Sequence, residues 1–148
     1  MAVQEQVFGF YIPTVTLMGI GAYKELGKQI RTLNGKKPYI CTDKGIVDSG
    51  ILEKVVEVIR RDCEVEPVVY DKTQPNPTDA NVHEGLELYK QNGCDLIVSL
   101  GGGSSHDCGK GIGIVASNGN RMNIHKDMGL VPEVFTETNL QQLSGHLA

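Results

Sequence analysis

Residues 92–119 read Asn-Gly-Cys-Asp-Leu-Ile-Val-Ser-Leu-Gly-Gly-Gly-Ser-Ser-His-Asp-Cys-Gly-Lys-Gly-Ile-Gly-Ile-Val-Ala-Ser-Asn-Gly, the pattern of a strand, a glycine loop and a helix. The apolar run at 96–100 contains β-branched residues, as expected of a strand that is buried on both faces. Three consecutive glycines follow it, Gly101, Gly102 and Gly103. They let the backbone turn tightly and approach a bound group that a Cβ would exclude.

The helix after the glycines is predicted to begin at Ser104 or Ser105, because serine is a favoured N-cap residue, and Asp107 then falls in its first turn. A helix that opens from a glycine loop presents unpaired N–H groups and the positive end of its dipole. Phosphate or pyrophosphate is the usual ligand of such a site. The alternative is a tight strand-to-helix turn without a ligand; the tendency of α/β proteins to bind ligands at strand ends favours the anion site.

The composition indicates one soluble domain. The 148 residues are 40% hydrophobic and 22% charged, with a formal net charge of −4. This charge does not suggest a nucleic-acid or anionic-membrane partner, and no apolar run approaches the ~20 residues of a membrane span. The amino end lacks a signal-peptide pattern. We therefore expect a cytoplasmic protein with reduced thiols at four widely spaced cysteines: Cys41, Cys63, Cys94 and Cys108.

Strands and helices alternate along the chain. Residues 7–20 are rich in β-branched and aromatic residues and are interrupted by Pro13, which predicts two short strands. The elements predicted next are the helix Tyr23–Leu33, the strand Lys37–Asp43, the helix Ile51–Arg61, the strand Glu66–Tyr70 and a helix that ends at Gln91. This alternation implies an α/β fold with parallel strands and right-handed crossovers.

Two loops at strand ends carry candidate ligand-binding residues. Asp43 ends a strand, where its carboxylate could accept hydrogen bonds from a ribose diol or could equally cap the following helix. In the segment 74–79, two prolines flank Asn76 and stiffen the loop. Thr78 or Asp79 can cap the next helix, and the rigid loop could also present the Asn76 amide to a ligand.

The motifs Thr42-Asp43, Pro75-Asn76-Pro77-Thr78 and the ten residues from Gly101 to Lys110 occur in the order found in a known family. Over about residues 7–120 the chain resembles the iron-containing (group III) alcohol dehydrogenases. The resemblance implies a Rossmann-like NAD(P) domain, a mostly parallel sheet with helices on both faces. It also implies reversible oxidation of a short primary alcohol or diol to its aldehyde.

Carried over from the resemblance, Asp43 would hold the adenosine ribose and favour NAD over NADP. Like-charge repulsion between this carboxylate and a 2′-phosphate supports the same choice. Asn76 would approach the cofactor. The pyrophosphate would lie against Gly102, Gly103 and Ser104.

Asp107 and Lys110 occupy the family's Ser-x-x-Asp-x-x-Lys positions. They lie three residues apart on the predicted helix, so they share a face and can pair with each other as well as serve the nucleotide site. Asp95, before the last strand, matches a common family aspartate, for which a structural cap is the preferred role.

The family pattern is absent after about residue 120. The resemblance therefore implies a cofactor domain at residues 1–120 that lacks its last strand, an unassigned tail at 121–148, and no catalytic or metal-binding residue in this chain. The family's Fe2+ or Zn2+ would need the absent metal domain, because the four histidines lack metal-ligand spacing: His83, His106, His125 and His146.

We therefore expect a truncated dehydrogenase, arising from a frameshift or gene break, that binds NAD(H) weakly and is inactive alone. Its family would act on a small alcohol or aldehyde and could form homo-oligomers. The alternatives are a non-catalytic nucleotide-binding or subunit-association module that docks through an open sheet edge, and a fragment that folds poorly and has no function.

Overall fold

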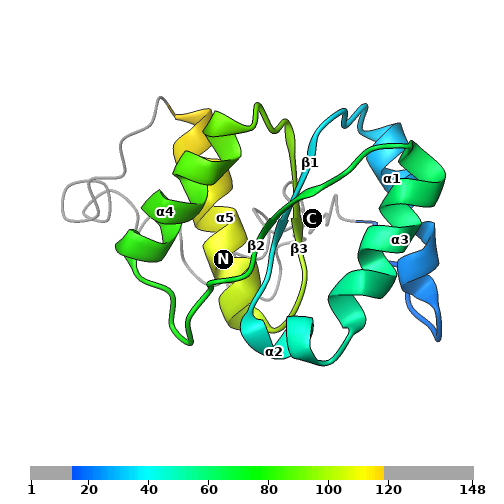
Figure 1. The fold of residues 1–148 in the computed structure, drawn as a ribbon, viewed down its shortest axis with the longest axis horizontal. Coiled ribbons are helices and arrows are strands. Elements are labelled where there is room, and N and C mark those ends of the chain that lie inside the picture. The colour runs from blue at the N-terminus through cyan, green and yellow to red at the C-terminus, as the bar shows by residue number, and fades with distance from the viewer. Residues whose placement is uncertain (1–14, 119–148) are drawn as a thin grey trace, which may run out of the picture.

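A small parallel sheet forms the centre of the protein, for which the computed structural model describes residues 15–118 (Figure 1). The strands are β1 (Pro38–Cys41), β2 (Val68–Tyr70) and β3 (Leu96–Ser99), in the order β2-β1-β3. Both pairings are parallel, and Ile40 of β1 lies opposite Val69 and Val98 of its two neighbours. The predicted α/β fold with a parallel sheet is confirmed.

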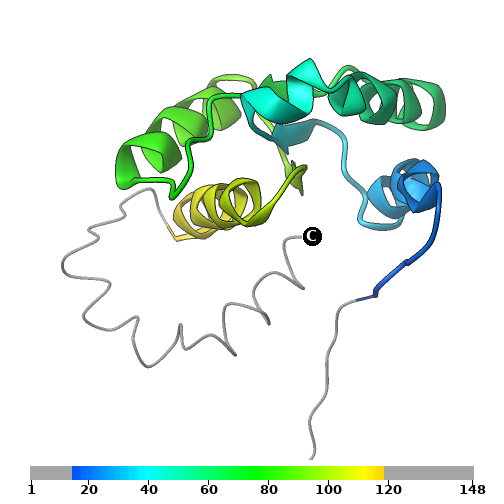
Figure 2. The same cartoon turned by 90° about the horizontal axis from the view of Figure 1, so that it is seen from below.

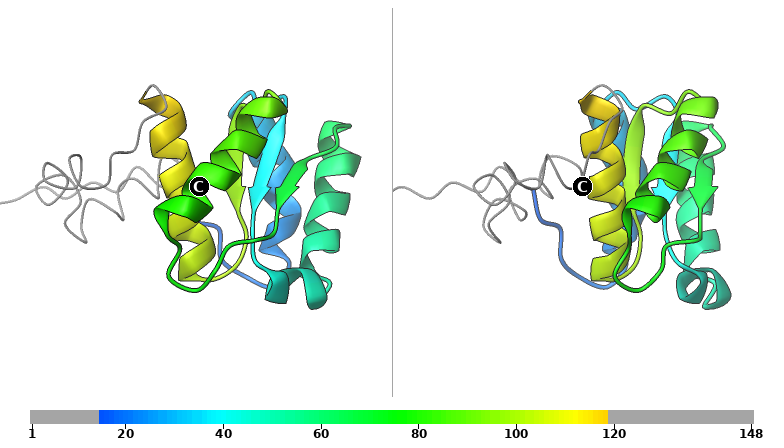
Figure 3. Two further views of the ribbon diagram at one scale, coloured as in Figure 1. Left: turned by 60° about the vertical axis from the view of Figure 1, so that its left-hand side comes forward. Right: turned by 90° about the vertical axis from the view of Figure 1, so that its left-hand side faces the viewer.

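Helices cover both faces of this sheet (Figures 1 and 2). On one face lie α1 (Leu26–Thr32) and α3 (Ile51–Cys63), and on the other lie α4 (Asp79–Gln91) and α5 (Gly103–Ser117). The two side views in Figure 3 show the same layers edge-on. A 3-10 turn, η2 (Ala22–Glu25), precedes α1, so the helix predicted at 23–33 is present with a tighter first turn.

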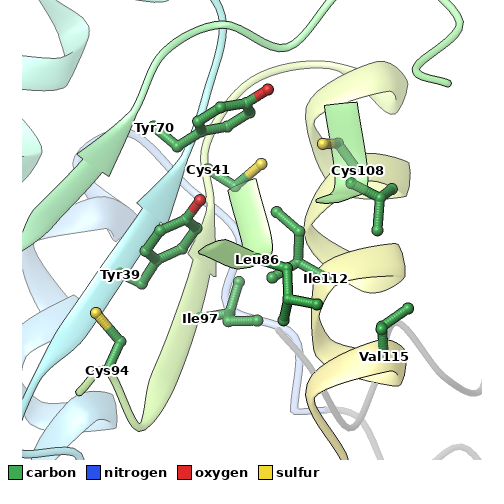
Figure 4. Close-up of a cluster of buried hydrophobic side chains, with 10 residues drawn as sticks. Tyr39, Cys41, Tyr70, Leu86, Cys94, Ile97, Cys108, Ile112 and Val115 are labelled. Atoms are coloured by element: carbon green, nitrogen blue, oxygen red, sulfur yellow. The ribbon is translucent and has the colours of Figure 1, made fainter. Parts of the chain in front are cut away.

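The core consists of two apolar clusters, one on each face of the sheet. Alternate residues of β1 point to opposite faces, as the pleat requires, so Tyr39 and Cys41 join one cluster and Ile40 joins the other. The cluster between the sheet, α4 and α5 is drawn in Figure 4 and includes Tyr70, Leu86, Ile97, Cys108, Ile112 and Val115. The other cluster contains Ile30, Val55, Val56 and Ile59. Burial on both faces explains the continuous apolar strands.

One expected strand is absent. Residues 15–20 form no strand, and the side chains of Val15, Met18 and Ile20 are largely exposed. β-branched residues stabilise a strand only through neighbours, and none of the described strands pairs with this segment. The strand expected within residues 7–14 lies outside the described residues.

A short helix that was not predicted from the sequence follows β1. This is α2 (Lys44–Asp48), and Gly50 separates it from α3 with a φ of 78°, in the left-handed region that favours glycine. Among the residues that the structure describes, none of the helices combines the length and apolar character that a bilayer crossing requires. All four cysteines are free.

Candidate functional site

The crevice at the carboxyl ends of β1 and β3 is the place where the fold gathers the predicted ligand-binding residues. From β1 the chain turns through α2 to α3 on one face of the sheet, whereas from β3 it turns to α5 on the other face. Figure 1 shows α2 and the first turn of α5 side by side at the lower edge of the sheet. Neighbouring parallel strands whose connections leave in opposite directions form the usual ligand crevice of α/β proteins.

Two hydrogen bonds fix the floor of this crevice. The Thr42 hydroxyl donates to the Leu100 carbonyl at 2.7 Å, and the Leu100 N–H donates to the Cys41 carbonyl at 2.9 Å. Thr42 is fully buried. The two strand ends are therefore held together beyond the last residues of the strands themselves.

Asp43 caps α2 and also reaches across the crevice. Its Oδ1 accepts the Ile46 N–H at 3.1 Å, which settles that the capping role is real. Its Oδ2 accepts a hydrogen bond from the Ser105 hydroxyl of α5 at 2.9 Å. Each carboxylate oxygen has two lone pairs, so both keep capacity for a ligand hydroxyl. The cap and the ribose interaction are thus compatible.

The three glycines serve different purposes. At Gly101 φ is 138°, and a Cβ would lie 2.7 Å from Ser105 Oγ and 2.9 Å from Asp43 Oδ2, so the fold itself requires glycine there. At Gly102 and Gly103 a Cβ would meet no protein atom within 4 Å. Those two positions border open space at the start of α5. We call them the glycine cradle, and its binding of a phosphate stays a prediction.

The start of α5 differs from the prediction by one or two residues. The helix begins at Gly103, with Gly102 as its N-cap in an extended conformation, so neither Ser104 nor Ser105 is the cap. Asp107 consequently lies in the second turn. The prediction was wrong because the Ser105 hydroxyl bonds Asp43 instead of its own helix.

The helix start has the groups of an anion site. The His106 N–H is paired with the Gly102 carbonyl at 3.2 Å. The N–H groups of Gly103, Ser104 and Ser105 precede it and have no acceptor within the helix. They form the positive end of the dipole of a 15-residue helix.

The loop of Asn76 lies against this helix start. The Asn76 N–H donates to Ser104 Oγ at 3.3 Å, across 28 residues of sequence, and Asn76 has a φ of 52°. Thr78 caps α4, and its N–H donates to Asn81 Oδ1 at 3.4 Å in a capping box. The structure therefore brings Asn76 to the cradle, while its role toward a cofactor stays a prediction.

Asp107 and Lys110 pair as their spacing predicts. Lys110 Nζ lies 3.7 Å from Asp107 Oδ1, and the lysine side chain is 15% exposed against 63% for the aspartate. The Asp95 carboxylate accepts hydrogen bonds from the backbone N–H groups of Lys36 and Lys37, at 2.9 and 2.8 Å. These contacts lie at the amino ends of β1 and β3. This confirms a structural role for Asp95, away from the crevice.

Two thiols lie beneath the glycine loop, in the core cluster of Figure 4. Cys41 and Cys108 are fully buried, and Cys41 Sγ lies 3.5 Å from Thr73 Oγ1. A hydrogen bond with the Cys108 thiol and burial together raise the pKa of Cys41 far above its usual range. Cys41 is therefore a neutral core residue at neutral pH.

Metal ligands do not gather in the described part of the chain. His83 lies on α4 and His106 on α5, and no group of three or more histidine, cysteine, aspartate or glutamate side chains within residues 15–118 could hold a metal ion. His125 and His146 lie outside the described residues. The residues in view therefore do not fit the family's metal site.

Known proteins match this chain in both sequence and structure. The sequence profile of the family described as iron-containing alcohol dehydrogenase matches residues 13–142. This match runs past residue 120, where the motifs end; the tail lies outside the described residues, so the domain boundary at 120 stays a prediction.

Two relatives are dehydrogenases named for short alcohols. The NAD-dependent methanol dehydrogenase of Bacillus methanolicus is 42% identical over 122 residues, which are 82% of this chain and 32% of that protein. The 1,3-propanediol dehydrogenase of Citrobacter freundii is 41% identical over 115 residues, or 76% of this chain and 30% of that protein.

Solved structures give the same result. A 1,3-propanediol oxidoreductase superposes with a TM-score of 0.74 at 38% identity, covering 80% of this chain and 31% of the other. An alcohol dehydrogenase from Oenococcus oeni has a TM-score of 0.71 at 35% identity, covering 78% and 30%. The chain thus spans about a third of the length of the relatives it matches. On the strength of the profile match and these structural neighbours, the chain belongs to the iron-containing alcohol dehydrogenase family.

Proposed function

We propose that this chain is the NAD(H)-binding part of an alcohol dehydrogenase that interconverts a short primary alcohol or diol and its aldehyde. The observation that carries the proposal is the convergence of Asp43, the open glycine cradle and Asn76 at one crevice. These residues are far apart in sequence and come from three different loops.

The geometry supports partners for two parts of a dinucleotide, the diphosphate and the adenosine ribose. The diphosphate would lie at the start of α5, against Gly102, Gly103 and the hydroxyl of Ser104. The adenosine ribose would donate its hydroxyls to Asp43, which is joined to α5 by a single hydrogen bond of 2.9 Å. The two subsites are adjacent, as the covalent link between ribose and diphosphate requires.

The charge at Asp43 supports NAD(H) as the cofactor. A ribose diol donates two hydrogen bonds to a carboxylate, whereas a 2′-phosphate would bring a second negative charge next to it. We also propose that Asp107 and Lys110, whose charged groups lie 3.7 Å apart on α5, serve the nucleotide site as well as pair with each other.

The bound dinucleotide would supply the hydride acceptor and donor, and the chain's own contribution is to bind and orient it. Because residues 15–118 hold no group of metal ligands, we assign the family's metal chemistry to none of them. We propose that the chain alone binds NADH weakly and oxidises no alcohol. The relatives are dehydrogenases, two of them named for methanol and 1,3-propanediol. This match favours the cofactor-binding part of an alcohol dehydrogenase over a nucleotide-binding or subunit-association module that takes no part in catalysis. A cytoplasmic location and assembly into homo-oligomers are proposed from composition and resemblance.

The test is a fluorescence titration of the full chain with NADH and NADPH, repeated for Asp43→Asn. Asparagine keeps a cap oxygen but removes the charge, so the preference for NADH over NADPH should fall by about tenfold, or 1.4 kcal/mol. Asp48→Asn, an exposed aspartate on α2 paired with Lys44, is the matched control and should change neither affinity.

Absence of any dinucleotide binding by the unaltered chain would reject the proposed function. Equal titrations for the unaltered chain and Asp43→Asn, with both cofactors, would reject the role of Asp43 alone.

A further inference from the structure

Ser105 uses its hydroxyl in an unusual way for a helical serine. Ser117 on the same helix donates to the carbonyl four residues before it, Gly113, at 2.8 Å. Ser105, by contrast, donates to Asp43 Oδ2 at 2.9 Å, a partner 62 residues away on the other side of the crevice. Ser105 is fully buried, so water does not compete for this bond.

This bond completes the restraint of the Asp43 carboxylate. Oδ1 is held by the Ile46 N–H of α2, and Oδ2 is held by Ser105 of α5. With both oxygens held from opposite walls of the crevice, the plane of the carboxylate is fixed. Each oxygen still has a free lone pair for a ligand hydroxyl.

The surroundings preserve this contact. Gly101 passes so close that a Cβ on it would lie 2.7 Å from Ser105 Oγ and 2.9 Å from Asp43 Oδ2. Glycine at this position therefore leaves the room in which the serine and the aspartate meet.

We propose that Ser105 is a positioning residue that sets how strongly Asp43 selects a dinucleotide without a 2′-phosphate. This inference rests on the proposed function. The hydroxyl holds the carboxylate in the plane that accepts two ribose hydroxyls, while the Ser105 N–H belongs to the anion-binding start of α5. One residue thus couples the ribose subsite to the diphosphate subsite.

The experiment measures the dissociation constants of NADH and NADPH for the full chain and for Ser105→Ala. Loss of one hydrogen bond to a charged group should raise the dissociation constant of NADH by about threefold to tenfold. That of NADPH should change by less than about twofold, because NADPH gains little from the oriented carboxylate. Ser117→Ala, which removes a hydroxyl from the far end of the same helix, should leave both within about twofold.

A second variant and a second background separate positioning from packing. Ser105→Cys fills nearly the same volume with a weaker donor, so the NADH preference should fall while the melting temperature stays near that of the unaltered chain. In the Asp43→Asn background, Ser105→Ala should no longer change the preference, because the charge that it positions is gone.

Equal weakening of NADH and NADPH by Ser105→Ala and Ser105→Cys would overturn the inference, as would an undiminished effect in the Asp43→Asn background. If the unaltered chain binds neither dinucleotide, the proposed function fails and this inference fails with it. If the unaltered chain binds NADH but the Ser105 variants give either of the results above, only the inference about Ser105 fails.

Discussion

The three adjacent glycines differ in their surroundings. A side chain at Gly101 would clash with the protein, whereas Gly102 and Gly103 border open space at the start of α5. Gly101 is needed by the fold, because its φ of 138° and its contact with Ser105 exclude a side chain. Gly103 is helical and has no protein atom within 4 Å of an ideal Cβ. None of the neighbouring protein atoms requires glycine at Gly103, which agrees with the proposed diphosphate site in front of α5.

We therefore expect Gly103→Ala to weaken NADH binding without lowering the stability of the fold. Alanine in a helix is more favourable than glycine by about 0.5–1 kcal/mol, so the melting temperature should stay the same or rise. The new Cβ would occupy the space that a diphosphate approaches, and NADH should bind about tenfold more weakly, or 1.4 kcal/mol. Thermal melts and fluorescence titrations measure the two effects.

Gly111→Ala on the same helix should give the reverse. Its Cβ would lie 2.7 Å from Val82 Cγ2, inside the contact between α4 and α5. Stability should fall by up to about 2 kcal/mol, with binding retained. Weaker NADH binding by Gly111→Ala, or unchanged binding by Gly103→Ala, would contradict this interpretation of the cradle.

The sequence could predict that the candidate site residues lie together at strand ends, but it could not predict their contacts. Asp43, Asn76 and the glycines follow strands, and strand ends face the ligand crevice in α/β proteins. The sequence left Asp43 between a cap and a ribose ligand, and the structure shows the cap. Ser105 was missed as a partner of Asp43 because a serine near a helix start has the pattern of an N-cap, and nothing local marks a bond across 62 residues.

At the scale of elements, the packing of α5 on the sheet supports the position of the cradle. Ile112 is fully buried in the cluster between the sheet, α4 and α5 (Figure 4). A Cβ on Gly85 of α4 would lie only 2.5 Å from Ile112 Cδ1, so the two helices approach each other closely. This contact holds α5 against α4.

Ile112→Ala should lower the free energy of unfolding by about 2–5 kcal/mol, because it removes buried methyl groups and leaves a cavity. Urea denaturation followed by circular dichroism measures the change. Leu33→Ala is the control, since that side chain is 62% exposed, and it should change stability by less than about 0.5 kcal/mol. Similar losses for both variants would show that α5 is not packed as described.

Element types were predictable wherever periodicity was strong. The apolar spacing of α3 and the short apolar runs of β1, β2 and β3 predicted the right structure within a few residues. The segment 15–20 did not follow its composition, because strand formation depends on a neighbouring strand that a local pattern cannot specify. The short α2 was missed because five residues carry too little periodicity.

At the scale of the whole molecule, the strand order creates the site. Alternation of strands and helices predicts parallel pairing, but it does not determine that β3 pairs with β1 on the side away from β2. Only this order places the ends of β1 and β3 next to each other and brings Asp43 within hydrogen-bond distance of α5. The chain belongs to the iron-containing alcohol dehydrogenase family and spans about a third of the length of the relatives it matches.

Binding of a dinucleotide at this crevice can be measured by the amide chemical shifts of the 15N-labelled full chain during a titration with NADH. We expect the shifts to concentrate around the carboxyl ends of β1 and β3, at Ile46, Asn76, Gly102, Gly103 and Ser104. A different cavity lies near the amino ends of the strands and is lined by residues that include Arg31, Asn34, Lys36 and Arg61. Shifts confined to that cavity, or no shifts at NADH concentrations in the millimolar range, would show that no dinucleotide binds at the crevice.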